Sequence, residues 1–294
     1  MTKDFQAQKG GWPNHRLSPE EWKAKKKAEK DALYQMIDDT AAEIVTDPDK
    51  FRAYLDTQSQ MNRYSATNAL LIYKQCPAAP QLKDFDDWAE EKVSIKKGAK
   101  SISILEPVEY TRADGTTGIS YNVKKMFDVS QTTGKQNPAP TLNKDPRKLV
   151  AVMLDTAPVK VAMTDELPFP RMGALYDNDQ QTIYVKRGIG DSVAICQCVA
   201  QELAHAQLSV NCKSYSRKEM GFPAVCIAYM LCKRFGVDTR AFAIDRIPED
   251  WQNKEPKAIR AELTKTRGAM RDIYSHVSEQ LYRQRQERAK EQER

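Results

Sequence analysis

Five consecutive residues in the second half of the chain have the types and spacing of a degenerate metal-dependent hydrolase. The segment reads Gln201-Glu202-Leu203-Ala204-His205 and lies in a stretch with helical periodicity. Zinc peptidases of the zincin type carry His-Glu-x-x-His on a helix, where two histidines hold the ion and the glutamate takes a proton from the bound water. Gln201 stands in place of the first histidine, and an amide oxygen is a weak ligand for zinc. The sequence therefore predicts His205 as a remnant ligand, Gln201 as a degenerate ligand position and Glu202 as a vestigial general base.

The rest of the expected ligand set is also incomplete. A third ligand usually lies on a following helix, and the matching stretch 223–229 has no carboxylate, with Val225 where one is expected. We expect no bound cofactor, and Gln201, Glu202 and His205 would then persist as a hydrogen-bonded polar cluster in an old cleft. The alternative is an active zinc-dependent endopeptidase with a rebuilt ligand set. The further residues available to that set are Cys198, Cys212, Glu219 and Cys226.

The segments around this motif predict an α+β unit with a mixed sheet. Extended patterns at 173–176 and 182–185 flank an Asp-Asn-Asp turn, and another strand is expected at 159–163. Helical patterns cover about 149–156, 191–210, 216–235 and 257–285. The motif would therefore lie on a helix that follows a strand-turn-strand unit and precedes another helix.

The first half of the chain predicts helices packed beside a small antiparallel sheet. Ser18-Pro19-Glu20-Glu21 is a helix start, and a basic run from Lys23 to Lys30 follows it, which we interpret as the solvated face of that helix. Further helices are expected at about 49–58, 65–75 and 85–92. Alternation around 102–108 and 119–123, with Asp-Gly between, predicts a β-ribbon.

The ribbon and the residues before it have the composition of a protein surface that binds nucleic acid. From Lys92 to Lys135 the sequence has 8 basic residues against 4 acidic ones. Binding an unpaired strand requires cations for phosphates and aromatic rings for bases. Lys96-Lys97-Gly98 suits a tight turn that brings the backbone close to a phosphate. Each of these residue types also has an interpretation without DNA. Trp88 is compatible with an anchor in the core, and Tyr64 with either a core or a stacking position. Exposed lysines are compatible with simple solvation.

Several motifs in a fixed order make the chain similar to a known family. From about Asp31 to Leu281 it resembles the ArdC-type antirestriction proteins and their LtrC-like relatives of plasmids and conjugative transposons. The motifs are Tyr64-Ser65-x-x-Asn68-x-Leu70-Leu71-Ile72, Gln75 and Pro77, Phe85-x-x-Trp88, Ile95 to Lys100, Phe127 to Thr132, Gly173 to Val185, Gln201 to His205 and Ala228 to Asp238.

The resemblance implies an N-terminal domain that binds single-stranded DNA and a C-terminal zincin-like (gluzincin-like) metallopeptidase domain, in a protein that protects conjugated DNA from restriction. Gln201 and Val225 depart from the family pattern, so we expect a pseudoenzyme. The DNA would contact Arg63, Tyr64, Asn68, Trp88, Lys96, Lys97, Gly98, Lys100, Lys124 and Lys125. A further alternative is a C-terminal scaffold that binds a host or element-encoded protein.

Length and composition set the remaining expectations. The 294 residues suffice for two domains, and net charge is +6. We expect a disordered lead (1–19), a DNA-binding domain (20–135), a linker (136–147), a metallopeptidase-related domain (148–285) and a charged tail (286–294). The polar start of the chain, the six scattered cysteines and the lack of a long apolar run predict a cytoplasmic protein with reduced thiols and no membrane contact.

Overall fold

Local capping signals determine where the first three helices begin. Helix α1 (Pro19–Ile44) starts with a capping box in which Ser18 and Glu21 each accept a hydrogen bond from the other's backbone N–H. The side chain of Asp47 caps α2 (Pro48–Gln60), and that of Ser65 caps α3 (Ala66–Gln75). The structure, a computed structural model, describes residues 17–77, 79–134, 145–170, 172–210, 212 and 214–292. The predicted lead therefore lies almost entirely outside the described residues.

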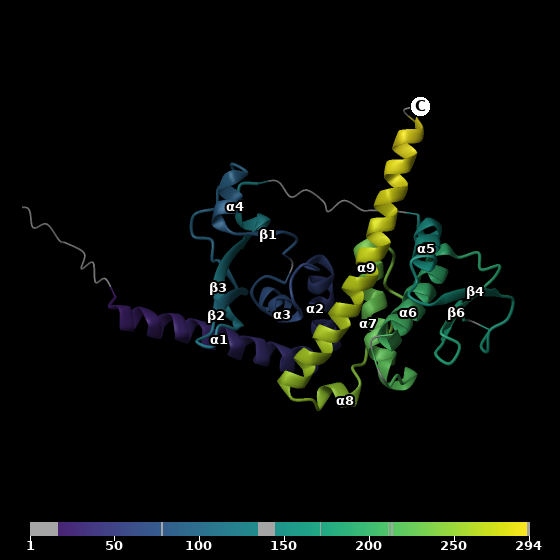
Figure 1. Ribbon diagram of the computed structural model, residues 1–294, viewed down its shortest axis with the longest axis horizontal. Coiled ribbons are helices and arrows are strands. Elements are labelled where there is room, and N and C mark those ends of the chain that lie inside the picture. Colours follow the sequence, from purple (N-terminus) through teal and green to yellow (C-terminus); the bar gives the residue numbers. More distant parts are fainter. Residues whose placement is uncertain are drawn as a thin grey trace, which may run out of the picture.

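The first sheet is built around the predicted β-ribbon. Strands β2 (Ile102–Thr111) and β3 (Thr117–Asp128) pair antiparallel along their full length, and the short β1 (Leu82–Lys83) pairs with the far end of β3. At the turn, Asp114 accepts a hydrogen bond from the backbone N–H of Thr116, and Gly115 has φ +80°. Helix α4 (Phe85–Glu90) covers the β1 end of this sheet (Figure 1).

The second sheet is mixed, as the sequence predicts. Strand β4 (Lys160–Thr164) runs parallel to β6 (Thr182–Lys186), and β5 (Ala174–Asp177) runs antiparallel to β6 on its other side. The other elements are the 3₁₀ turn η1 (Val129–Gln131) and helices α5 (Pro146–Asp155), α6 (Ser192–Val210), α7 (Arg217–Phe235), α8 (Glu249–Gln252) and α9 (Pro256–Gln292). Helices occupy the middle of the molecule between the two sheets, which confirms the predicted α+β class (Figure 1).

Two helices extend beyond the limits predicted for them. Helix α5 begins at Pro146, capped by Asp145, so the last two residues of the predicted linker are helical, and 136–144 lie outside the described residues. Helix α9 continues to Gln292, so most of the predicted tail is helical as well. Its Gln, Arg, Glu and Lys residues favour helix, and Arg283 pairs with Glu279 one turn earlier. Despite this length, no helix within the described ranges is apolar enough to cross a membrane.

The main hydrophobic core continues from the first three helices into the second half of the chain. Phe51 of α2, fully buried, lies with its ring centroid 5.3 Å from Phe222 of α7 and 5.9 Å from Trp251 of α8. Beside this cluster, the hydroxyl of Tyr229 donates a 2.7 Å hydrogen bond to Asp56. The halves are therefore joined by a packed interface, and their division into separate domains stays a prediction.

Candidate functional site

Glu202 is held by a guanidinium rather than being left free to accept a proton. Its side chain is buried on α6, and Arg217, the first residue of α7, donates to both carboxylate oxygens over 2.8 and 2.7 Å. The backbone N–H of Tyr176 in β5 donates a third hydrogen bond of 2.7 Å. Such a bidentate, charge-assisted arrangement satisfies the carboxylate and ties α6, α7 and β5 together.

His205 is buried one turn further along α6 and is held in its neutral form. The hydroxyl of Tyr215 lies 2.8 Å from His205 Nδ1, and the two rings are perpendicular with centroids 6.2 Å apart. Burial, and then the positive charge of Arg217, lower the pKa of His205 from 6.5 to about 3. Burial also raises the pKa of Tyr215 to about 12. The pair is therefore uncharged at neutral pH.

These residues do not fit the catalytic metal that the family pattern implies. In a zincin the glutamate faces a metal-bound water, but both oxygens of Glu202 face Arg217, whose positive charge repels a divalent ion. Gln201 is half-buried and makes no side-chain hydrogen bond to any described residue. Only His205 has an imidazole to offer, and a single ligand does not define a site.

The residues that could have rebuilt a ligand set lie apart. Cys226 is fully buried beside Tyr54 of α2, while Glu219 is exposed in the first turn of α7. Cys198 packs against Gly173, and the thiol of Cys212 donates to the carbonyl of Ser214. Among the residues that the structure describes, no three His, Cys, Asp or Glu side chains form a group that could hold a metal ion.

Sequence reasoning missed Arg217, Tyr215 and Tyr176, which complete the polar cluster around Glu202 and His205. A signal was available, because a buried carboxylate on an apolar helix requires a cationic partner. Tyr-Ser-Arg stands at 215–217, immediately before the next predicted helix. Which nearby cation would be that partner depends on how the two helices pack, and the sequence does not specify it.

Asn68, a predicted DNA contact, instead forms hydrogen bonds with the backbone at the free edge of β2. Its amide donates to the carbonyl of Leu105 and accepts from the backbone N–H of the same residue, both over 2.9 Å. Two turns along α3, Gln75 makes the same pair of 2.9 Å bonds with Ser103. Because the amides of the buried Asn68 and the half-buried Gln75 bond to the unpaired edge of β2, Asn68 is not free to bind a nucleotide.

Trp88, Lys124 and Lys125 are likewise engaged within the protein. Trp88 is 2% exposed, and its indole N–H donates to the carbonyl of Phe127, so it is the core anchor considered as an alternative. Lys124 lies 3.0 Å from both Asp84 and Glu106, and these partners raise its pKa. Lys125 pairs with Glu29 of α1. None of the three presents a free ring face or an unpaired charge to a ligand.

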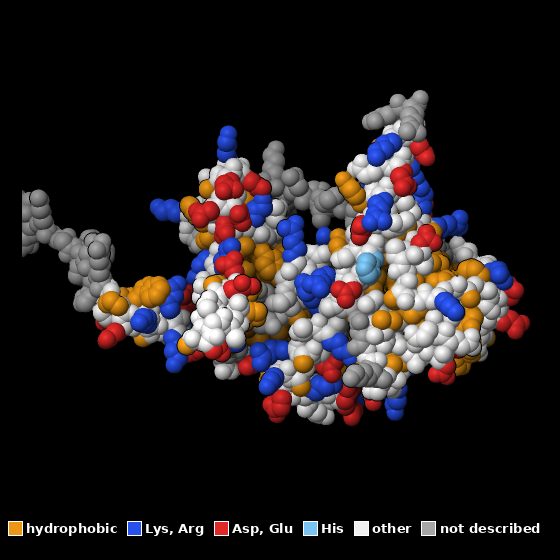
Figure 2. Space-filling model, viewed as in Figure 1, with side chains coloured by type: hydrophobic (Ala, Val, Ile, Leu, Met, Phe, Trp, Pro, Cys, Tyr) orange, Lys and Arg blue, Asp and Glu red, His pale blue; other side chains and the backbone are white. Residues whose placement is uncertain are grey.

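The other predicted contacts are more accessible. Lys96, Lys97, Gly98 and Lys100 lie together in one exposed turn, which Gly98 closes with φ +83°. Lys96 donates to the carbonyl of Ser130, whereas Lys97 and Lys100 make no ion pair with any described residue. Carboxylates gather over α4, which precedes this turn in the sequence (Figure 2).

Arg63 and Tyr64 lie just before α3, away from that turn in the sequence. Arg63 is exposed, and Tyr64 is half-buried against the small core beneath the ribbon. The outer half of the ribbon bears four exposed apolar side chains, Val108, Tyr110, Ile119 and Tyr121. Of the aromatics considered for stacking, Tyr110 and Tyr121 are therefore more accessible than the buried Trp88.

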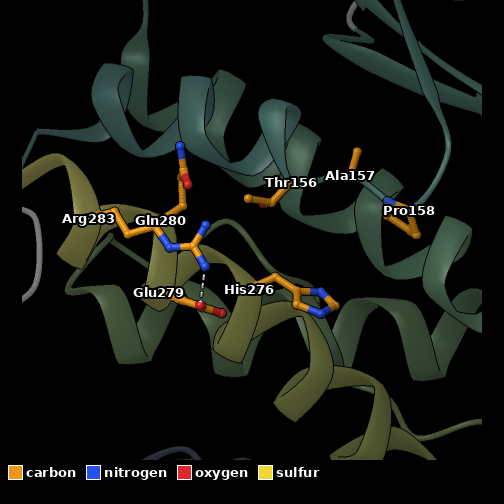
Figure 3. A pocket seen from close by; sticks show the side chains of 7 residues that line it. All are labelled: Thr156, Ala157, Pro158, His276, Glu279, Gln280 and Arg283. Carbon is orange, nitrogen blue, oxygen red and sulfur yellow. Dashed lines mark hydrogen bonds and ion pairs between the residues drawn. The ribbon is translucent and has the colours of Figure 1, made fainter.

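A pocket of about 400 Å³ lies elsewhere, where the end of α5 meets α9 (Figure 3). Its lining residues are Thr156, Ala157, Pro158, His276, Glu279, Gln280 and Arg283. Within it, Arg283 pairs with Glu279 across 2.5 Å, and this ion pair leaves neither charge free. None of the predicted site residues lines it.

Comparison with known proteins identifies the fold. No family model and no curated protein matches the sequence. The metal-free crystal structure of the antirestriction protein ArdC from plasmid R388 is similar, with TM-score 0.52 and 14% identity over 75% of this chain and 86% of that one. Its Mn(II)-bound structure gives TM-score 0.51 and 13% identity over 74% and 85%. The chain therefore has the fold of the plasmid antirestriction protein ArdC.

Proposed function

We propose that this protein binds single-stranded DNA in the antirestriction machinery of a mobile genetic element, and that its C-terminal half does not hydrolyse peptide bonds. The observation that carries the proposal is the likeness to ArdC, which extends over 86% of the ArdC chain and so includes both halves. At this identity the likeness supports the role through the shared fold rather than through shared residues.

The accessible turn at Lys96–Lys100 supports the DNA-binding part. Lys97 and Lys100 are exposed cations without carboxylate partners in the described part of the chain, and Gly98 leaves the backbone of the turn open to a phosphate. Arg63 and Tyr64 are the other members of the predicted set that remain accessible. We omit Asn68, Trp88, Lys124 and Lys125 from the proposed contact set because their polar groups are already bound.

Charge reversal in the turn tests this assignment. We expect the K97E/K100E variant to bind a fluorescent single-stranded oligonucleotide about tenfold more weakly at low salt, with a log–log salt dependence shallower by about 1.4, because two phosphate contacts are lost. Fluorescence anisotropy at several salt concentrations gives both values. The matched control is K160E/K218E, which reverses two exposed lysines of the C-terminal half. Equal affinity and slope in K97E/K100E and wild type would remove the turn from the contact set.

The arrangement of Glu202 and Arg217 supports the loss of peptidase activity. A general base must accept a proton from an activated water, and both oxygens of Glu202 already accept hydrogen bonds from a cation. His205 has no second imidazole four residues earlier, because that position is Gln201.

Metal analysis tests this second part. After dialysis against Mn(II) or Zn(II) and removal of free ions, we expect well under one equivalent of metal per chain, and the same amount in His205→Ala. One equivalent in the wild type that disappears in His205→Ala would contradict the proposal and favour a working metallopeptidase.

A further inference from the structure

The first three turns of α1 project from the molecule as an isolated basic arm (Figures 1 and 2). Residues 19–28 are all exposed, and the first buried residue of the helix is Leu33. The capping box at Ser18 and Glu21 fixes the start of the helix without help from a packed neighbour. A helical segment that is polar on all sides is stabilised little by burying an apolar face. Packing within the protein therefore does not explain why this segment is rich in lysine.

Three lysines of this arm and Lys30, just beyond it, form one continuous stripe. Lys23, Lys26, Lys27 and Lys30 are spaced i, i+3, i+4 and i+7, which places them within an arc of about 100° on the helix surface. The same arc further along the helix is occupied by Leu33, Ile37, Ala41 and Ile44, which are buried in the core. The face that packs against the protein in the second half of α1 is therefore cationic in the first half.

The acidic side chains near the stripe are largely engaged elsewhere. Glu21 accepts a hydrogen bond from the backbone of Ser18, and Glu29 pairs with Lys125 of the ribbon. Among the described residues, the only carboxylate within 4.0 Å of a stripe lysine is that of Glu29, 4.0 Å from Lys26. Lys23, Lys27 and Lys30 make no ion pair within the same part of the chain.

Trp22 gives the stripe an aromatic partner. Its side chain is 54% exposed, in contrast with Trp88 and Trp251, which are buried. The ammonium of Lys26 lies 5.7 Å from the centre of its ring. An accessible indole beside a row of cations is the combination that binds a base and its neighbouring phosphates.

We infer that Lys23, Lys26, Lys27, Lys30 and Trp22 form a separate contact for single-stranded DNA, an inference that rests on the proposed function. The ribbon lies beside the arm, because Lys125 of β3 reaches Glu29 of α1. The stripe therefore adjoins the N-terminal half, which also carries the proposed contacts at Arg63, Tyr64 and the Lys96–Lys100 turn. The arm has only Leu17 and Trp22 as large exposed apolar residues, too few to insert a helix into a lipid surface.

The test compares the full-length chain with the K23Q/K26Q/K27Q/K30Q variant. Glutamine keeps the helix propensity and removes four charges. We expect single-stranded DNA affinity to fall ten- to a hundredfold at low salt, and the log–log salt slope to become shallower by about 3. Trp22→Ala alone should weaken binding about tenfold with little change in slope.

Two control variants distinguish the effect of the stripe on DNA affinity from the effect of net charge. K148Q/K160Q/K218Q/K257Q removes four exposed lysines outside α1 and should keep nearly the wild-type affinity. Four Lys→Arg changes in the stripe should also keep it. Wild-type affinity and slope in the four-glutamine variant would overturn the inference, as would a loss confined to vesicles of phosphatidylserine and phosphatidylcholine. No binding of single strands by the wild type would instead refute the proposed function itself.

Discussion

Replacing Arg217 by alanine is expected to lower the free energy of unfolding by about 3 kcal/mol, because it leaves the buried carboxylate of Glu202 without its cation. This is the lower end of the range for broken buried ion pairs, since 39% of the Arg217 side chain is exposed to solvent. The midpoint of thermal unfolding should fall by roughly 6–12 °C. Urea denaturation at neutral pH gives the first value and a thermal scan the second.

A second substitution distinguishes lost charge pairing from lost packing. In E202Q/R217A the glutamine oxygen can still accept from the backbone N–H of Tyr176, and no buried charge remains. The double variant should therefore be clearly more stable than Arg217→Ala alone. Equal stability of the two variants would show that Glu202 does not need the guanidinium.

The sequence predicted local structure well wherever a short-range signal existed. The capping residue Ser18, the Asp-Gly turn at 114–115 and the helix that carries Glu202 and His205 all follow from patterns within a few residues. The α+β class and the mixed second sheet follow from those elements in order. These features depend on interactions that the chain makes with its immediate neighbours in sequence.

Side-chain partners across the fold could not be predicted in the same way. Asn68 belongs to a motif that resembles the family, and Trp88 is an aromatic residue just before the basic segment, so both suggested a ligand. Their partners, the backbone at Leu105 and at Phe127, are 37 and 39 residues away. A strand edge without a neighbouring strand needs polar side chains to satisfy it, but the sequence does not indicate which side chains do so. The type of a residue and its place in a motif therefore could not separate contacts with a ligand from contacts within the protein.

The core shared by the two halves has a consequence for their stability. Phe51→Ala is expected to destabilise the protein by about 3–5 kcal/mol, because the side chain is fully buried among aromatic rings of α7 and α8. If the halves unfold as one unit, the loss should appear equally in both. If residues 20–135 and 148–285 are independent domains, the loss of stability should differ between the two halves.

Two buried tryptophans allow the unfolding of each half to be measured separately. Trp88 reports on the first sheet, and Trp251 reports on the junction of α2, α7 and α8. Chains that keep only one of them, with the other tryptophans changed to phenylalanine, can be unfolded in urea with and without Phe51→Ala. We expect both midpoints to fall together, while Phe169→Ala, which removes a 65% exposed ring, should leave both unchanged. A fall seen by Trp251 but not by Trp88 would show that the packed interface at Phe51 does not couple the ribbon to the C-terminal helices.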